Sequence, residues 1–216
     1  MTQVAAGAPT TQGRSAEFWG YVMWGLAGLA ILVPELMSIF SIADWPTISA
    51  TVGHLEARHD WVRLIVVFVI VALAYYAVPQ LAKRPDAAGM VGGRQVTANG
   101  RLTADIEAVG YQNMGGYLVF AFVAYAVGVA FAAGARAVHP GTFLGGYVLY
   151  GIIALVWVII PSALAMFLAR EVAFPTLFRT LAYLGRRAHW LAAVVLALLV
   201  ILLIHLAFYP WPQLDW

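Results

Sequence analysis

The sequence predicts an all-helical, polytopic integral membrane protein with five transmembrane helices. The first observation is composition: of 216 residues, 63% are apolar and only 10% are charged, whereas a soluble domain carries about 25% charged residues. A soluble fold could not cover its surface with so few charges, so the remaining surface must face lipid. The second observation is that the apolar residues form runs of about 20, the length that crosses a hydrocarbon core of about 30 Å.

Five such runs divide the chain into one membrane domain, residues 18–210, with short flanking segments. The predicted spans are residues 18–42, 61–81, 115–137, 143–168 and 190–209. Residues 1–17 are small and polar and are predicted to be disordered. A polar loop, 82–114, follows the second span, an arginine-bearing connector, 170–188, follows the fourth, and residues 211–216 form a tail.

The third observation is the distribution of basic residues, which sets the orientation. With five spans, the N-terminus, the 82–114 loop and the 170–188 connector share one side and hold most of the 12 basic residues: Arg14, Lys83, Arg84, Arg94, Arg101, Arg170, Arg179, Arg186 and Arg187. The other side has only Arg58, Arg63 and Arg136. The positive-inside rule then predicts a cytoplasmic N-terminus, a cytoplasmic 82–114 loop and an outer C-terminus. We expect the membrane to be the plasma membrane.

Several chemistries are excluded by composition. The chain has no cysteine, which rules out disulfides, thiolate metal sites, iron–sulfur ligation and cysteine nucleophiles. The net charge of +2 is too small and too scattered to indicate a nucleic-acid partner. No Ser–His–Asp arrangement or other catalytic constellation is visible, so the sequence indicates a protein that is not an enzyme.

Residues 44–61, DWPTISATVGHLEARHDW, lie between the first two spans and combine histidines, acids and tryptophans. The pattern predicts a short amphipathic helix on the outer surface, with Ile48, Val52, Leu55 and His59 as its protein-facing stripe. His54 and His59 are five residues apart, about 140° around a helix, which does not suit a two-point metal site. Glu56 and His59, three apart, do meet. We therefore predict no metal site here, but a proton- or ligand-binding role for Glu56.

Glu35 is the only acid within a predicted span. An ionisable group in the membrane costs about 3 kcal/mol on insertion scales, so it usually faces a protein partner or a water cavity. Pro34 beside it cannot donate to the carbonyl of Ala30, which leaves a free acceptor near the acid. Two interpretations are open: a proton- or cation-binding site, or an interhelical hydrogen bond in an apolar bundle.

Four of the five histidines are predicted on the outer side: His54, His59, His139 and His205. A b-type haem needs axial ligands on two helices at matching depth, and His59 and His205 could provide them. His189, predicted at the inner side, lacks a visible partner for a second haem.

Two patterns bear on packing. Ala124, Gly128 and Ala132 recur every fourth residue in the third span, which predicts a close-packing stripe on a central helix. Residues 20–25, GYVMWG, resemble residues 146–151, GYVLYG, and each span then meets a proline. Since these spans run in opposite senses, the resemblance suggests an inverted repeat of two helices around a central third, a signature of transporters.

The sequence is compatible with three functions. The leading expectation is a non-enzymatic membrane subunit or scaffold that packs in the bilayer against other membrane proteins or copies of itself, because the soluble parts are small. The first alternative is a small transporter or channel in which Glu35 binds a proton or cation near Pro34. The second is a cytochrome-like electron-transfer anchor with haem b at His59 and His205.

Overall fold

The computed structural model describes residues 16–82, 90–91, 94–95, 101–139, 141–168 and 172–207, with side chains described in most of these ranges. Of residues 1–17, which are predicted to be disordered, residues 1–15 lie outside the described residues, as does the tail at 211–216, whereas Ala16 and Glu17 are the first two residues of α1. Within them the chain is helical apart from one short antiparallel pair, β1 (Met90–Val91) with β2 (Arg94–Gln95). The all-helical prediction is confirmed for this part of the chain.

Four helical segments are long and apolar enough to cross a membrane: Ala16–Ile39, Met114–Val138, Leu144–Phe167 and His189–Ala207. The first is α1 (Ala16–Ile39), the second belongs to α4 (Arg101–Val138), and the last is α8 (His189–Ala207). The third joins α5 (Leu144–Ile152), the π-helix η1 (Ile153–Ile159) and α6 (Ile160–Phe167). The predicted second span corresponds to α3 (Asp60–Ala82), which does not meet the same test over its described residues.

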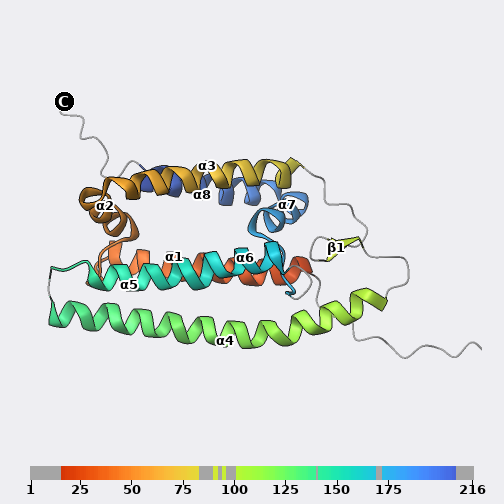
Figure 1. The fold of residues 1–216 in the computed structure, drawn as a ribbon, viewed down its shortest axis with the longest axis horizontal. Helices are drawn as coiled ribbons and strands as arrows, with labels where there is room; N and C mark the ends of the chain where they lie inside the picture. The colour runs from red at the N-terminus through yellow and green to blue at the C-terminus, as the bar shows by residue number, and fades with distance from the viewer. Residues whose placement is uncertain are drawn as a thin grey trace, which may run out of the picture.

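Two short helices complete the chain. They are α2 (Ile48–Arg58), between α1 and α3, and α7 (Leu177–Arg187), between α6 and α8. Two expectations are corrected here. The predicted 82–114 loop is helical from Arg101 onward, because α4 begins there. The third span is not central: α4 lies along one edge of the molecule in Figure 1, although its Gly128 and Ala132 are buried against α5 as the small-residue stripe predicts.

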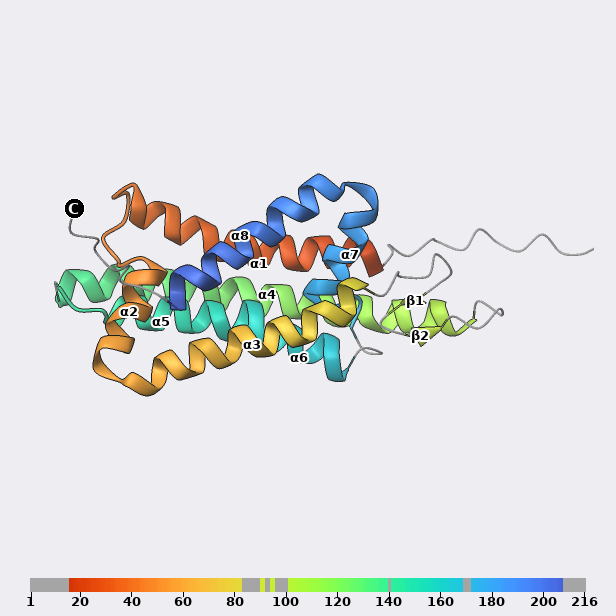
Figure 2. The same ribbon diagram turned by 90° about the horizontal axis from the view of Figure 1, so that it is seen from above.

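The helices form two layers held apart at their ends. In Figure 1, α3 and α8 form one layer, α1, α4 and α5–η1–α6 the other, and α2 and α7 stand between the layers at opposite ends. Figure 2, viewed from above, shows α3 and α8 lying over the second layer and diverging toward the end that holds α7. Each layer has its own buried apolar clusters: α3 and α8 share one with α7, through Ala77, Phe178 and Leu181, and the other layer has two.

The two short helices occupy equivalent places and are built alike. Thr47 begins α2 with φ −63° and ψ 162°, and Thr176 begins α7 with φ −61° and ψ 159°. In each helix a threonine four residues later donates its hydroxyl to the first threonine's carbonyl, over 2.8 Å from Thr51 and 3.0 Å from Thr180. Each helix ends with an extended residue whose N–H bonds a leucine carbonyl four residues back.

The same correspondence extends to the sequence. Aligning the two N-cap threonines pairs these identical residues: Pro46 with Pro175, Thr47 with Thr176, Thr51 with Thr180, Leu55 with Leu184, Arg58 with Arg187, and Trp61 with Trp190. Across the molecule, Gly146 of α5 meets the first turn of α2, and Gly20 of α1 meets the first turn of α7. The resemblance of the GYVMWG and GYVLYG segments therefore belongs to a larger inverted arrangement, in which α1–α2–α3 is matched by α5–η1–α6–α7–α8.

Proline and a left-handed residue explain two irregularities. Pro161 has no N–H for the carbonyl four residues earlier, and the preceding turns widen into η1, where the Ile160 N–H bonds the carbonyl of Leu155. At the end of α1, Ser41 takes a positive φ of 55°. The N–H of Ile42 bonds the Met37 carbonyl over 2.8 Å, and that of Ser41 bonds the Ser38 carbonyl over 3.0 Å, which is the Schellman pattern that usually has glycine at this position.

We expect Ser41→Gly to stabilise the protein by about 0.5–1 kcal/mol, because glycine avoids the left-handed steric penalty of about 1–2 kcal/mol but adds chain entropy to the unfolded state. The measurement is unfolding by SDS titration in mixed micelles. Ser41→Ala is the control and should give no gain, since alanine keeps the β-carbon. A loss of stability in Ser41→Gly would show that the serine side chain contributes more than its backbone strain costs.

Candidate functional site at the ends of the two layers

Glu35 lies at the junction of three helices. Its Oε2 accepts a hydrogen bond from the Ile48 N–H at 2.7 Å and another from the Tyr150 hydroxyl at 3.1 Å. Ile48 is the first residue of α2, so the carboxylate satisfies a helix N–H that has no partner within its own helix and lies at the positive end of the helix dipole. Thr47 caps the same turn by accepting from the Ala50 N–H at 3.1 Å. Glu35 thus joins α1, α2 and α5.

Trp45 fixes the chain between α1 and α2. Its indole Nε1 donates to the carbonyl of Pro34 at 3.1 Å, and its own carbonyl accepts from the Ser38 hydroxyl at 2.7 Å. The ring is buried in the cluster that contains Leu149 and Tyr150. At the other end of the molecule, Trp24 donates from Nε1 to the carbonyl of Pro175 at 2.8 Å. An indole bonded to a backbone carbonyl therefore anchors both ends.

Glu56 lies on the buried face of α2, which corrects the predicted orientation of that helix. The buried residues are Ser49, Thr51, Gly53 and Glu56, whereas His59 follows the helix and is exposed. Only 1% of the Glu56 side chain is accessible, and neither carboxylate oxygen has a hydrogen-bond partner within the described part of the chain. Its countercharge is Arg63 of α3, whose Nε lies 3.5 Å from Oε2 and whose side chain is 58% exposed.

His54, on the same helix, contacts α5. Its ring stacks on Phe143 with the centroids 4.0 Å apart, and its Nδ1 is hydrogen-bonded to the Tyr147 hydroxyl. Burial of the ring, followed by the positive charge of Arg58, lowers the pKa of His54 below its usual value of 6.5. The folded protein therefore favours neutral His54, whose Nδ1 shares a hydrogen bond with the Tyr147 hydroxyl.

Acidification is expected to weaken the α2–α5 contact through His54. Because the pKa of His54 is lower in the folded than in the unfolded protein, the unfolded chain binds the extra proton first. This contribution to stability is present above about pH 6.5 and is lost as the pH falls through the folded pKa. SDS-unfolding curves from pH 7.5 to 5 should show this loss, and His54→Gln should reduce it. An equal pH dependence in His54→Gln would assign the loss to other groups.

The two predicted haem ligands lie in different surroundings, although α2, which His59 follows, contacts α8, which carries His205. The His59 ring is exposed and lies 5.8 Å from the Trp61 ring, whereas His205, in the last turn of α8, is half-buried. A pair of axial ligands must face one common gap, which the exposure of His59 does not favour. Over the described residues, no cluster of three His, Cys, Asp or Glu side chains is placed to hold a metal ion.

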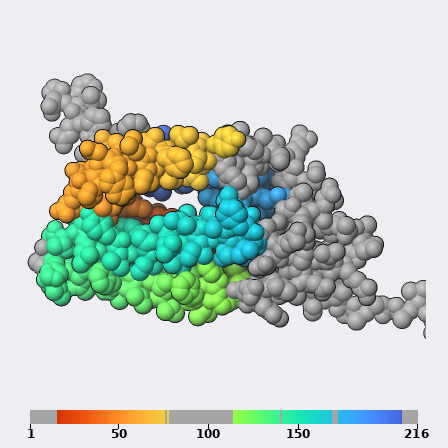
Figure 3. All heavy atoms as spheres, viewed as in Figure 1, coloured from red at the N-terminus to blue at the C-terminus, as the bar shows by residue number. Residues whose placement is uncertain are grey.

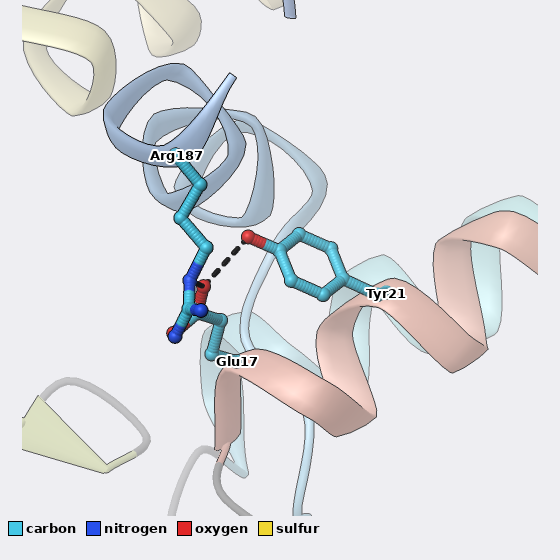
Figure 4. Close-up of polar contacts among 3 residues, drawn as sticks. All are labelled: Glu17, Tyr21 and Arg187. Atoms are coloured by element: carbon cyan, nitrogen blue, oxygen red, sulfur yellow. Dashed lines mark hydrogen bonds and ion pairs between the residues drawn. The ribbon is translucent and has the colours of Figure 1, made fainter. Parts of the chain in front are cut away.

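At the opposite end of the molecule, an ion pair that the sequence did not predict joins α1 to α7 (Figure 4). Glu17 at the start of α1 accepts from Arg187 of α7 through two hydrogen bonds, Nε to Oε1 at 2.5 Å and Nη2 to Oε2 at 3.0 Å. The Tyr21 hydroxyl donates to the same Oε1 at 2.7 Å. These bonds raise the pKa of Arg187 further above its usual value. Its 170-residue separation from Glu17 explains why the pair could not be found by spacing.

A hollow lies between the two layers (Figure 3), bounded by α3 on one side and α5–α6 on the other, with α2 at one end. The short helices α2 and α7 stand between the layers at opposite ends and hold them apart. The two helices of the α3–α8 layer are apolar, and few of their described residues are buried. Only 6% of the α8 span is buried, and exposed apolar residues occur on different sides of α3, as at Leu64, Val67 and Val69. The hollow therefore suits an apolar occupant.

Comparison with known proteins gives no relative: no protein-family model, curated protein or solved structure matches the chain.

Proposed function

We propose that the chain crosses the plasma membrane five times, with α3 as the fifth span, a cytoplasmic N-terminus and an outer C-terminus. Supporting this, α3 has 23 residues against 24 for α1. In Figure 1, α1, α4 and α8 run in one direction, and α3 and α5–α6 run in the other. The end that holds α7 would then be cytoplasmic, in accord with its arginines, and α2 would lie at the outer surface.

Single cysteines test this topology, since the chain has none of its own. Ser41→Cys and Thr142→Cys should react with a membrane-impermeant maleimide on intact cells, whereas Arg186→Cys should react only after permeabilisation. If α3 did not cross, Ser41→Cys and Thr142→Cys would be labelled from opposite sides of the membrane.

Within that topology, we propose that the protein is a non-enzymatic subunit of a larger membrane complex and that a transmembrane helix of a partner subunit fills the hollow. The observation that carries this proposal is the separation of the α3–α8 layer from the other layer by two short helices. Helices in lipid normally pack directly against one another at 8–10 Å, and nothing in the bilayer stabilises two layers that short helices hold apart. An apolar transmembrane helix of a partner would cover the apolar residues that α3 and α8 leave exposed.

Photo-crosslinking in the native membrane tests the proposal. A diazirine amino acid is placed at exposed positions on opposite sides of each helix: Val67 and Val69 on α3, and Leu198 and Val200 on α8. One position of each pair should give a discrete crosslinked protein product, while Val123, exposed on α4 outside the hollow, should give lipid adducts. Lipid adducts alone at all positions would show that acyl chains fill the hollow, which would overturn the proposal.

A transporter is the second candidate, favoured by the inverted arrangement of α1–α2–α3 and α5–η1–α6–α7–α8. Inverted repeats with proline-interrupted helices are common in transporters, with the site at the repeat interface. Glu35, beside Pro34 and bonded to Tyr150 of the other repeat, would be the ion-binding group. Proton or cation flux into liposomes should then be abolished in Glu35→Gln. Absence of flux in the unaltered protein, or equal flux in the variant, would remove this candidate.

A further inference from the structure

We propose that Arg58 with Trp61, and Arg187 with Trp190, form two equivalent binding sites for the phosphate groups of anionic phospholipids, one at each membrane surface. Among the residues that the two repeats share, Pro, Thr, Thr and Leu have matching roles inside the protein. The first threonine occupies the N-cap position of its helix, the second donates its hydroxyl to the carbonyl of the first, and the leucine carbonyl accepts the N–H of the residue that ends the helix.

The shared arginine and tryptophan have no such common role. Arg187 bonds Glu17, but in the other repeat the position that corresponds to Glu17 is Phe143, which stacks on His54 instead. The arginine is thus present in both repeats although its acidic partner is present in one. Trp61 and Trp190 are 58% and 71% exposed, and Arg58 and Arg187 are also exposed. Both Arg–Trp pairs therefore face the medium around the protein, and this exposure is what they have in common.

Those surroundings are the two membrane surfaces. The pairs lie where the short helices meet α3 and α8, at opposite ends of the molecule in Figure 1. Tryptophan favours the level of the lipid headgroups, where its ring is in the apolar region and its N–H is in the polar one. An arginine three residues earlier lies at a similar depth, and its planar guanidinium can bind a phosphate through two hydrogen bonds. The ligand is therefore the phosphate of a membrane lipid.

The two sites differ in strength. At the α7 end Arg186 adds a second positive charge next to Arg187, over the Tyr183 ring, but Glu17 competes with phosphate for Arg187. At the α2 end Arg58 lies near His54, and the ion pairs among the described residues join Glu56 to Arg63 and Glu17 to Arg187 but do not include Arg58. Removal of the competing carboxylate should consequently strengthen lipid binding at the α7 end. The placement of one site at each membrane surface rests on the five-span topology proposed above, and not on what fills the hollow between the layers.

Native mass spectrometry of the whole protein in mild detergent, titrated with phosphatidylglycerol, tests the two sites. Two lipids should be retained per chain, and phosphatidylcholine should bind more weakly. Arg58→Gln and Arg187→Gln should each weaken one binding event by about fivefold, as expected for a single interfacial arginine. Arg136→Gln, which changes an arginine that has no tryptophan three residues later, is the matched control and should leave both events unchanged.

Glu17→Gln keeps the proposal falsifiable if Arg187→Gln does not fold. It should tighten one phosphatidylglycerol binding event while weakening the joint between α1 and α7. Equal retention of phosphatidylcholine, or unchanged binding in Arg58→Gln and Glu17→Gln, would overturn the proposal. So would glycerol 3-phosphate binding as tightly as phosphatidylglycerol, because the site would then recognise free phosphate rather than a lipid.

Discussion

Gly146→Ala is expected to lower the free energy of unfolding by about 2–3 kcal/mol, the upper part of the range for an overpacked contact. A β-carbon at this position would lie 2.6 Å from Thr51 Oγ1 and 2.7 Å from Pro46 Cγ. Neither atom can yield easily, because the Thr51 hydroxyl is bonded to the Thr47 carbonyl and the proline ring is rigid. The added methyl must therefore push α5 away from the first turn of α2 and disturb the bonds of Glu35.

Gly151→Ala provides the matched control in the same helix. A β-carbon at Gly151 has no other atom within 4 Å, so this variant should be as stable as the parent protein or slightly more stable, since alanine favours the helix. SDS titration of both variants gives the comparison. If Gly146→Ala unfolded at the same SDS fraction as Gly151→Ala, the close approach of α5 to α2 would be wrong.

The inverted arrangement predicts a second destabilising substitution, which the same SDS titration can measure. A β-carbon at Gly20 would lie 2.6 Å from Thr180 Oγ1 and 3.1 Å from Pro175, so Gly20→Ala should also destabilise, with Gly25→Ala as its control. The effect should be smaller than at Gly146 because the proline is farther away. Destabilisation at one glycine and none at the other would contradict the equivalence of the two ends.

The membrane class and most helix positions could be predicted because they depend on local composition. Runs of apolar residues mark helices in lipid whatever their neighbours are, and α1, α3, α5–η1–α6 and α8 all lie within a few residues of the predicted spans. The polar stretch before the third span did not reveal that α4 begins at Arg101. A helix can extend beyond the membrane without an apolar run, so its start leaves no hydropathy signal.

The orientation of α2 was wrong for a physical reason. In water the apolar stripe of a short helix turns toward the protein, and this rule placed His59 inside. In the fold, specific contacts set the inner face of α2 instead, because Glu35 accepts from the Ile48 N–H and Thr51 lies against Gly146 of α5. Polar groups such as Ser49, Thr51 and Glu56 instead lie inside, where Thr51 bonds the Thr47 carbonyl. The stripe pattern could not distinguish these two cases.

The partners of the candidate site residues could not be predicted, because they come from distant parts of the chain. Glu35 was identified as an acid that must face a partner, and this follows from the cost of a charge in lipid. Its actual partner Tyr150 is 115 residues away, and no spacing rule connects the two. The resemblance between residues 20–25 and 146–151 did contain this information in part, since it aligns Tyr150 with Trp24, the residue that anchors the other end.

Arg63→Ala is expected to lower the free energy of unfolding by about 2 kcal/mol, because it leaves the Glu56 carboxylate buried without its countercharge. Removal of one partner from a fully buried pair costs about 3–5 kcal/mol. The value here should be lower, since the Arg63 side chain is 58% exposed and solvent weakens the pair. Glu56→Gln should cost less, because the arginine left behind can be hydrated.

The repeat supplies the control for this pair. The positions that correspond to Glu56 and Arg63 in the second repeat are Gly185 and Ala192, where a β-carbon on the glycine would lie 3.8 Å from that of the alanine. The contact between α7 and α8 is thus made without charged groups at the positions where α2 and α3 have an ion pair. The double variant Glu56→Gln/Arg63→Ala should therefore recover part of the stability lost in Arg63→Ala. A double variant less stable than Arg63→Ala would mean that Glu56 stabilises the fold through contacts other than the ion pair, because neutralising an unpaired buried charge can only help.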